Sequence, residues 1–274
     1  MSKITASDVN KLRKSTGAGI MDCKKALVEA NGDFDLAIEN LRKKGQKVAA
    51  KRADRDSSEG AVIAKVNDAN TTGIIISLNC ETDFVAKNES FVALANQIAN
   101  IALYANTKDE LLSSDFEDMT VQEKLIEQTG VIGEKLEIGS FERISSEFVG
   151  SYIHAGNKIA SIVGLSNSFD GASEVAKNVS MQAAAMNPVA LDESGVSKDV
   201  IEKEIEIAKE QLRAEGKPEA MLDNIAKGKL KKFFKENTLV NQAFIKDNKL
   251  SVTDYVKSVN PECSITDFKR SALV

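Results

Sequence analysis

Tryptophan is absent from this chain of 274 residues, which also contains only one histidine, three cysteines and three prolines. A catalytic triad or a histidine-based metal centre would depend on the single imidazole of His154. The cysteines Cys23, Cys80 and Cys263 are odd in number, far apart and without C-x-x-C spacing, so they predict free buried thiols rather than a disulfide scaffold or a zinc site. We therefore expect no metal centre and no bound cofactor.

The chain also lacks a phosphate-binding loop and a membrane-spanning run. No G-x-x-x-x-G-K-[ST] or G-x-G-x-x-G pattern occurs, and this absence argues against an enzyme with its own nucleotide site. The longest uncharged stretch, Ser90–Thr107, is interrupted by asparagine and glutamine, so no membrane span is expected. The N-terminus Met1-Ser2-Lys3-Ile4 shows no apolar signal region, which predicts a cytoplasmic protein.

Charge is unevenly distributed along the chain. The 36 basic and 41 acidic residues give a net charge of −5, yet residues 1–56 carry a net +5 and residues 57–274 a net −10. This asymmetry indicates a module boundary near Arg55–Gly60, and the length suggests about two or three domains. An aromatic content of 5% and the negative net charge disfavour a nucleic-acid binder.

The basic N-terminal segment reads as three short helices. Thr5 and Asp8 fit a capping box before a helix that carries Val9 and Leu12 on one face, and the glycines of residues 16–19 end it. A second helix is expected over Met21–Glu29. A third begins at Asp33 and leads into a basic tail, Arg42 to Arg52. That tail is either a solvated helix end that matches the macrodipole or a nucleic-acid contact.

The middle of the chain holds a weak internal repeat. Each copy is a hairpin of two strands followed by a helix, and together they predict a pseudo-symmetric α+β core with helices packed on antiparallel sheets. The first copy comprises Ala61–Val66, Ile74–Leu78 and Phe91–Ala105, and the second comprises Ser151–His154, Ile159–Leu165 and Ala172–Met186. A helix over Val121–Gly133 and a strand over Ile138–Ile144 are expected between the two copies.

After Pro188 the pattern is typical of a helical hairpin. Apolar residues follow 4-3-4 spacing at Ile201, Ile205, Ala208 and Leu212, as in a coiled-coil seam. Gly216 and Pro218 then break the helix before a return helix over Met221–Lys235. The pair forms either a projecting antiparallel arm or a helix pair that lies against the core.

The segment after the second strand, Asn79–Lys87, contains an unexpected aromatic residue. Phe84 is either a staple that folds back onto the next helix or an apolar wedge presented to a partner. Glu81 and Asp83 could share a face if the strand continued, but without a nearby histidine they read as solvated carboxylates. His154 reads as structural rather than catalytic.

Two long motifs resemble the signatures of the bacterial elongation factor Ts family. The first covers residues 16–27 (TGAGIMDCKKAL) and 29–33 (EANGD), and the second covers residues 80–87 (CETDFVAK). Shorter matches follow in the same order at Gly150–His154, Gly216–Pro218 and Ser251–Val256. The resemblance therefore spans nearly the whole chain.

This resemblance implies a fold and a domain division. The family has a ubiquitin-associated-like three-helix N-terminal module, a two-subdomain α+β core, a coiled-coil arm and a C-terminal tail. On this chain we expect the module over residues 1–55, the first core subdomain over 56–145 and the second over 146–274. The arm would occupy residues 197–236 within the second subdomain.

The resemblance also implies a function without covalent chemistry. The family is a guanine nucleotide exchange factor for elongation factor Tu, with which it would form a complex in the GDP-bound and the nucleotide-free state. Self-association through the arm is left open. The partner-binding residues expected from the family motifs are Thr82, Asp83, Phe84 and Val85, which would disturb the Mg²⁺ site, and Leu12, Ile20, Met21 and Lys24 in the module.

One position departs from the family pattern, and one alternative function stays open. Relatives often carry histidine where this chain has Gln182, which can form hydrogen bonds but cannot become cationic, so a neutral contact is expected there. The alternative is a ubiquitin-associated-like adaptor whose module binds another protein. An enzyme with its own active site is a more distant third.

Overall fold

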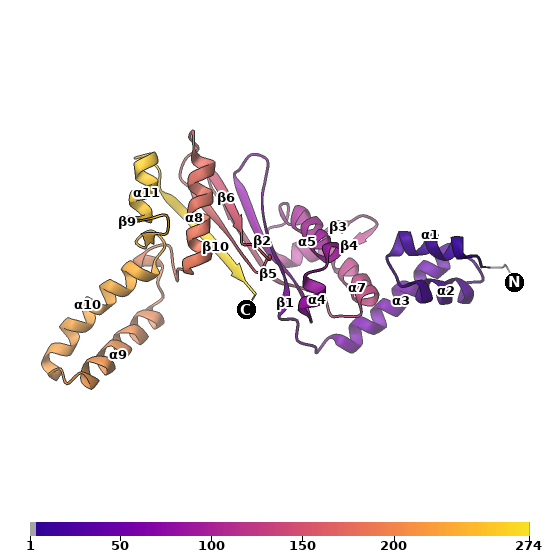
Figure 1. Cartoon of the computed structure of the whole chain (residues 1–274), viewed down its shortest axis with the longest axis horizontal. Helices are drawn as coiled ribbons and strands as arrows, with labels where there is room; N and C mark the ends of the chain where they lie inside the picture. The colour runs from indigo at the N-terminus through magenta and orange to yellow at the C-terminus, as the bar shows by residue number, and fades with distance from the viewer. Residues whose placement is uncertain (1–3, 274) are drawn as a thin grey trace.

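The computed structural model describes residues 4–273, in which three N-terminal helices lead into two small sheets and then into a pair of long helices (Figure 1). Strands within each sheet are antiparallel, in agreement with the predicted α+β class. Residues 1–3, part of the segment used to exclude a signal sequence, and residue 274, the end of the last predicted domain, lie outside the described residues.

The three predicted N-terminal helices are present as α1 (Ala6–Thr16), α2 (Ile20–Glu29) and α3 (Phe34–Arg52). The capping box forms as predicted, because the Thr5 amide and hydroxyl donate to the Asp8 carboxylate and the Asp8 amide donates back to the Thr5 hydroxyl. Gly17 ends α1 with a φ of +69°, in the left-handed region. The buried side chains that the helices share are Val9, Leu12, Ala18, Cys23, Ala26, Leu27, Ala30 and Ala37.

Helix α3 continues well beyond this small core and packs against α7 (Val121–Ile132). A Cβ placed on Gly130 of α7 would lie 2.4 Å from the Cα of Gly45 of α3, so the two backbones meet almost directly. The basic tail is solvated, as predicted, at Arg42, Lys43, Lys44, Lys47 and Lys51, which are exposed. Arg42 forms a surface ion pair with Asp118 at 2.8 Å, and only Arg52, which is half-buried, pairs with a carboxylate of the core described below.

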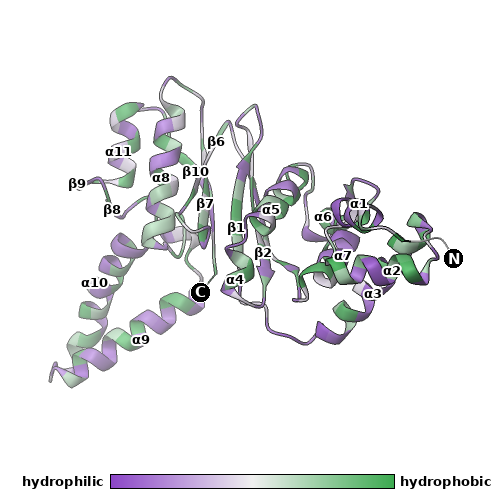
Figure 2. Cartoon of the chain, turned by 45° about the vertical axis from the view of Figure 1, so that its right-hand side comes forward, coloured by the Kyte–Doolittle hydropathy of each residue, from purple (hydrophilic) through white to green (hydrophobic). Residues whose placement is uncertain are grey.

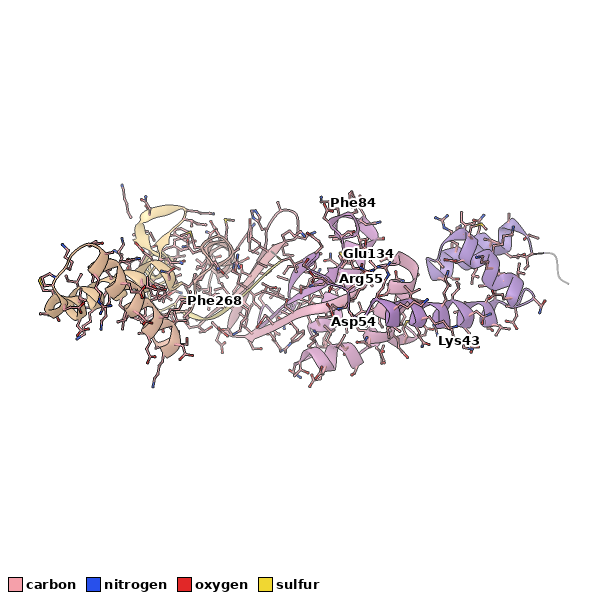
Figure 3. All side chains as sticks on the ribbon, turned by 90° about the horizontal axis from the view of Figure 1, so that it is seen from below. Lys43, Asp54, Arg55, Phe84, Glu134 and Phe268 are labelled. Atoms are coloured by element: carbon pink, nitrogen blue, oxygen red, sulfur yellow. The ribbon has the colours of Figure 1, made fainter. Side chains whose placement is uncertain are left out.

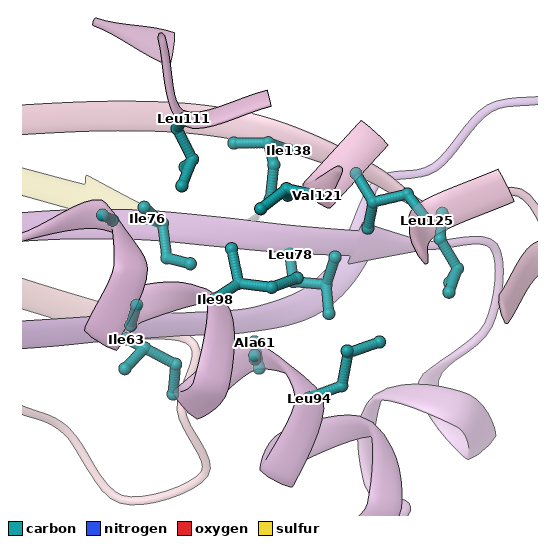
Figure 4. Packing of buried hydrophobic residues seen from close by; sticks show 14 of the residues in the cluster. Ala61, Ile63, Ile76, Leu78, Leu94, Ile98, Leu111, Val121, Leu125 and Ile138 are labelled. Carbon is teal, nitrogen blue, oxygen red and sulfur yellow. The ribbon is translucent and has the colours of Figure 1, made fainter. Parts of the chain in front are cut away.

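The first sheet has the strand order β1-β2-β5, built from β1 (Glu59–Val66), β2 (Thr72–Cys80) and β5 (Glu137–Ser145). Helix α5 (Glu89–Ala102) packs on β1 and β2, and the side chains between them point toward one another in Figure 4. The segment between α5 and α7 forms α6 (Lys108–Ser113), β3 (Asp115–Phe116) and β4 (Met119–Thr120). These elements close the largest hydrophobic cluster of the described chain.

The second sheet has the order β10-β7-β6 and contains β6 (Phe148–Ile153), β7 (Ile159–Leu165) and β10 (Ile265–Ala272). Helix α8 (Ala172–Met186) packs on β6 and β7 as α5 packs on β1 and β2. The two predicted strand–strand–helix units are thus both present, although α5 begins and ends earlier than expected and His154 lies just past β6. Ile98 of α5 and Val179 of α8 are both fully buried.

The two sheets pack face to face. The amide of Val62 donates to the carbonyl of Asn157 at 2.7 Å, and the amide of Val149 donates to the carbonyl of Asn70 at 2.6 Å. A separate apolar cluster fills the space between the sheets: Val62, Ala64, Ile75, Ile144, Val149, Ala160 and Ile162. The sheets therefore form one continuous scaffold between the N-terminal helices and the C-terminal half.

Helices α9 (Lys198–Ala214) and α10 (Glu219–Asn237) form an antiparallel hairpin that extends away from the sheets (Figure 1). Ala208 and Leu212 of the predicted seam are buried against α10, and Lys209 pairs with Asp223 across it at 2.5 Å. On α10 the buried side chains are Leu222, Ala226 and Phe234. Figure 2 shows hydrophobic and hydrophilic stretches alternating along both helices.

The remaining elements join the hairpin to the second sheet. A short 3-10 turn η1 (Glu193–Gly195) precedes α9, and β8 (Ala243–Phe244), β9 (Asp247–Ser251) and α11 (Val252–Val259) follow α10. The rings of Phe244 and Tyr255 stack with centroids 4.0 Å apart. This contact packs β8 against α11.

Candidate functional site

The segment that follows β2 folds into a single helical turn, α4 (Asp83–Ala86). Thr82 caps the turn, because its side chain accepts a hydrogen bond from the amide of Val85. Val85 and Ala86 face the main hydrophobic cluster, whereas Phe84 is 83% exposed and lies at the outer edge of the core in Figure 3. Phe84 therefore does not fold back as a staple, and the interpretation of an outward apolar side chain remains.

Glu134, which follows the end of α7, holds the start of this turn. Its Oε2 accepts from the amides of Glu81 and Thr82 at 3.1 and 3.0 Å, and its Oε1 accepts from the Thr82 hydroxyl at 2.6 Å. The thiol of Cys80 donates to the Thr82 carbonyl from below at 3.2 Å. Burial, together with the negative charge of Glu134, raises the pKa of that thiol to about 12, so Cys80 remains a neutral donor.

Glu81 ties the same segment to the last residue of α3. Both of its carboxylate oxygens accept from Arg52, at 2.7 and 2.8 Å, and Oε1 also accepts from the Lys135 amide at 2.6 Å. Burial alone would raise the pKa of Glu81, but the Lys135 amide and the Arg52 guanidinium outweigh it and lower that pKa from its ordinary value. Glu81 is thus a paired carboxylate and not the solvated one expected.

Asp83 pairs with Lys87 at 2.6 Å, four residues along the chain. The hydrogen bond from Lys87 lowers the pKa of Asp83. Glu81 and Asp83 therefore have different cationic partners and do not form a carboxylate pair for acid–base work. Thr82, Asp83, Phe84 and Val85 are consecutive at the capped start of α4, and we call this segment the α4 turn.

In the N-terminal helices the expected residues divide into exposed and buried ones. Ile20 and Met21, at the start of α2, are 52% and 63% exposed, and Lys24 on the same helix is exposed as well. Leu12 has no exposed surface, because it packs inside the three-helix core. Leu12 can therefore support the exposed residues of α2 from inside the module, but it has no exposed surface of its own for a partner to contact.

Gln182 is also fully buried, in the middle of α8. Its Nε2 donates to the Oε1 of Gln242 and to the carbonyl of Ala243, both at 3.1 Å, and its Oε1 accepts from the amide of Ile245 at 2.8 Å. All of these partners lie in or beside β8. Gln182 thus anchors the β8–β9 hairpin and does not present a surface contact of its own.

Within the described chain we find no group of three or more acidic, cysteine or histidine side chains arranged to hold a metal ion. His154 is exposed, and its Nδ1 lies 3.0 Å from the hydroxyl of Tyr152. Among residues 4–273, no helix has both the length and the apolar character needed to cross a membrane.

Sequence reasoning missed Glu134 and Arg52 as parts of this site. Glu134 lies 52 residues beyond Thr82, and Arg52 lies 29 residues before Glu81, so no local spacing connects them. The one available signal was the unexplained Glu81, a carboxylate immediately before an aromatic-containing turn. A partly buried carboxylate needs a cationic partner, and for Glu81 that partner is Arg52 of the basic tail.

Comparison with known proteins identifies the family of this chain. The chain belongs to a family of translation elongation factors. That family is elongation factor Ts, whose family model, described as "Elongation factor TS", matches residues 81–273. Proteins named Elongation factor Ts from Christiangramia forsetii and Flavobacterium psychrophilum are 69% and 66% identical over 273 residues, covering 100% of both chains in each comparison. A protein of the same name from Porphyromonas gingivalis is 44% identical and covers 98% of each chain.

Proposed function

We propose that this chain is a guanine nucleotide exchange factor for elongation factor Tu, acting in the cytoplasm during translation elongation. It would bind the GDP-bound GTPase, disturb the Mg²⁺ and phosphate site, and stabilise the nucleotide-free state until GTP enters. The observation that carries this proposal is the α4 turn, where an 83% exposed phenylalanine stands on a capped and hydrogen-bonded support. An aromatic side chain held in this way is suited to insertion into a partner.

The physical requirement for exchange is a coupling free energy. GDP is held largely by Mg²⁺ and by phosphate-binding amides, so a factor that binds the empty GTPase more tightly must weaken GDP binding by the same factor. A coupling of about 5 kcal/mol corresponds to a several-thousandfold loss of nucleotide affinity. Burial of one phenylalanine contributes roughly 1.5–3 kcal/mol, so Phe84 cannot supply the whole effect.

Two surfaces share the work in this proposal. The α4 turn (Thr82 to Val85) disturbs the Mg²⁺ site, with Phe84 as the inserted side chain. Ile20, Met21 and Lys24 of α2 hold the nucleotide-binding domain of the GTPase. Gln182 and Leu12 act indirectly, by fixing the elements around them.

The proposed organisation follows the family. Residues 1–55 form a ubiquitin-associated-like module, residues 56–145 and 146–274 form the two core subdomains, and residues 197–236 form a coiled-coil arm. The arm is free either to contact the GTPase or to pair with a second copy of the chain. The factor uses no cofactor and performs no covalent step.

The test is the release rate of a fluorescent GDP analogue from elongation factor Tu of the same species. We expect strong acceleration by the wild-type chain and a reduction of about tenfold to a hundredfold in that acceleration for Phe84→Ala. Tyr104→Ala is the matched control, because Tyr104 is an 88% exposed aromatic residue outside the α4 turn.

The outcomes separate the function from its mechanism. Acceleration that survives Phe84→Ala unchanged would keep the exchange function but assign the work to other contacts. If the wild-type chain does not accelerate release, the exchange function is wrong, and the module would be better explained as an adaptor that binds another protein.

A further inference from the structure

We propose that Glu134 is a positioning residue for nucleotide exchange, which holds the α4 turn in the orientation that Phe84 needs. This inference rests on the proposed function and adds a residue outside both signature motifs. Glu134 acts through Glu81, which precedes the α4 turn, and through Thr82, the first residue of the turn.

The first step is the number of hydrogen bonds that one carboxylate accepts. Oε2 takes the amides of Glu81 and Thr82, and Oε1 takes the Thr82 hydroxyl at 2.6 Å. Hydrogen bonds to an ionised acceptor are shorter and stronger than hydrogen bonds between neutral groups. Three of the roughly four lone-pair sites of this carboxylate thus accept hydrogen bonds from the segment that leads into α4.

The second step is the rigidity of the segment that carries Glu134. It follows Gly133, the left-handed C-cap of α7, and it precedes Lys135, whose amide donates to Glu81 at 2.6 Å. Two consecutive residues after α7 thus bond to two consecutive residues after β2. The end of α7 and the end of β2 are joined by this double attachment.

The third step is how the α4 turn would behave without this attachment. The turn has only four residues, too short to be stable alone, and its cap contact from the Val85 amide to Thr82 is long at 3.4 Å. Val85 and Ala86 still anchor one side of it in the core. Loss of Glu134 would therefore leave the turn attached but free to change its direction, and with it the direction of Phe84.

The experiment measures stimulated GDP release as a function of the concentration of this chain for wild type, Glu134→Ala and Glu134→Gln. We expect Glu134→Ala to lower the maximal rate about tenfold, with little change in the half-saturating concentration, because the α2 surface is intact. Glu134→Gln should restore most of the rate. Its carbonyl oxygen can accept from the two amides while its amide nitrogen donates to the Thr82 hydroxyl.

A double-mutant cycle with Phe84→Ala makes the test specific. If Glu134 works through Phe84, Glu134→Ala has no further effect on the rate once Phe84 is alanine. Glu123→Ala is the matched control, because Glu123 accepts from the Thr120 amide and hydroxyl at the other end of α7. It should leave the release rate unchanged.

A second measurement does not depend on exchange activity. Hydrogen exchange of the Glu81 and Thr82 amides in the free protein should become at least about tenfold faster in Glu134→Ala, because both amides lose their acceptor. Unchanged amide protection, or rate losses from Glu134→Ala and Phe84→Ala that simply add, would overturn the inference. An inactive wild-type chain would instead remove the proposed function, and amide protection would still decide whether Glu134 holds the turn.

Discussion

Gly130 of α7 faces Gly45 of α3 so closely that a Cβ on Gly130 would lie 2.4 Å from the Cα of Gly45. No side chain separates the two helices at this crossing. A side chain added at Gly130 would therefore meet the backbone of α3, which cannot move aside as the end of a flexible side chain can. The crossing is the main contact between the long third helix and the core. It therefore sets how the N-terminal surface is oriented relative to the α4 turn.

Gly130→Ala should force α3 and α7 apart. We expect a loss of about 1–3 kcal/mol in the free energy of unfolding, because α3 would lose its close packing against α7. Tryptic cleavage near Lys51–Arg55 should become faster for the same reason. Urea unfolding and limited proteolysis measure the two effects.

Gly228→Ala is the control for that substitution, because Gly228 lies within α10 and an added Cβ meets nothing within 4 Å. It should stabilise the protein by about 0.5–1 kcal/mol through helix propensity. Equal stability of Gly130→Ala and wild type would show that the crossing is looser than described.

Glu81 predicts a pH dependence of stability. Its pKa in the folded protein is below the ordinary value of 4.5, because the Lys135 amide and then the Arg52 guanidinium outweigh the effect of burial, so the ionised carboxylate stabilises the fold above that pH. This contribution decreases as the pH falls through the lower folded pKa, where the carboxylate becomes protonated in both states. We expect Glu81→Gln to be less stable than wild type at pH 7, and the difference to shrink below about pH 4.

Urea unfolding of both proteins between pH 3 and 7 checks this expectation. Asp83→Asn is the comparison, since Asp83 also has a lowered pKa but forms an exposed pair with Lys87 that solvent screens. Its effect should be the smaller one. A Glu81→Gln difference that stays constant with pH would assign the stabilisation to something other than the charge.

Gln182 offers a prediction about the β8–β9 hairpin. Gln182→Ala removes one acceptor and two donated hydrogen bonds from a fully buried position and leaves the Ile245 amide without its partner. We expect a loss of about 1–3 kcal/mol in the free energy of unfolding. Gln122→Ala, at an exposed position of α7, should have almost no effect.

Stimulated GDP release by Gln182→Ala, measured at a temperature where the variant is folded, then separates structural from direct roles. A reduced stability with an unchanged release rate agrees with the anchoring role. A large loss of rate with full stability would mean that Gln182 meets the partner after all.

The sequence predicted the elements well where the information was local. Helical periodicity and the capping residues Thr5 and Asp8 marked the N-terminal helices, and the two β-branched hairpins marked the central strands of both sheets. Spacing alone did not show that α3 would continue as far as Arg52 and cross α7. That outcome depends on Gly45 and Gly130 meeting, which is a contact between distant parts of the chain.

The candidate site was predicted only in part, because some of its contacts also join distant segments of the chain. The outward orientation of Phe84 was one of two readings of a local motif, and the structure decides between them. Helical spacing placed Leu12 beside Val9 on one face, and both are buried, so the assignment of Leu12 to the partner surface came from the family motif and not from that pattern. The burial of Gln182 could not be read from the motifs, because a motif does not say which side of a helix meets the core. The support from Glu134 requires two chain segments 52 residues apart to come together.

The length of α3 has one more consequence for the proposed complex. This helix has 19 residues and forms a rod about 28 Å long. It runs from the three-helix core that carries α2 to Arg52, which pairs with Glu81 just before the α4 turn. Two binding patches linked in this way act as a bivalent ligand, so that when one patch detaches, the other keeps it at high effective concentration and rebinding is fast. Dissociation of the complex would then proceed in stages, and an incoming nucleotide could compete for the α4 side while α2 still holds the GTPase.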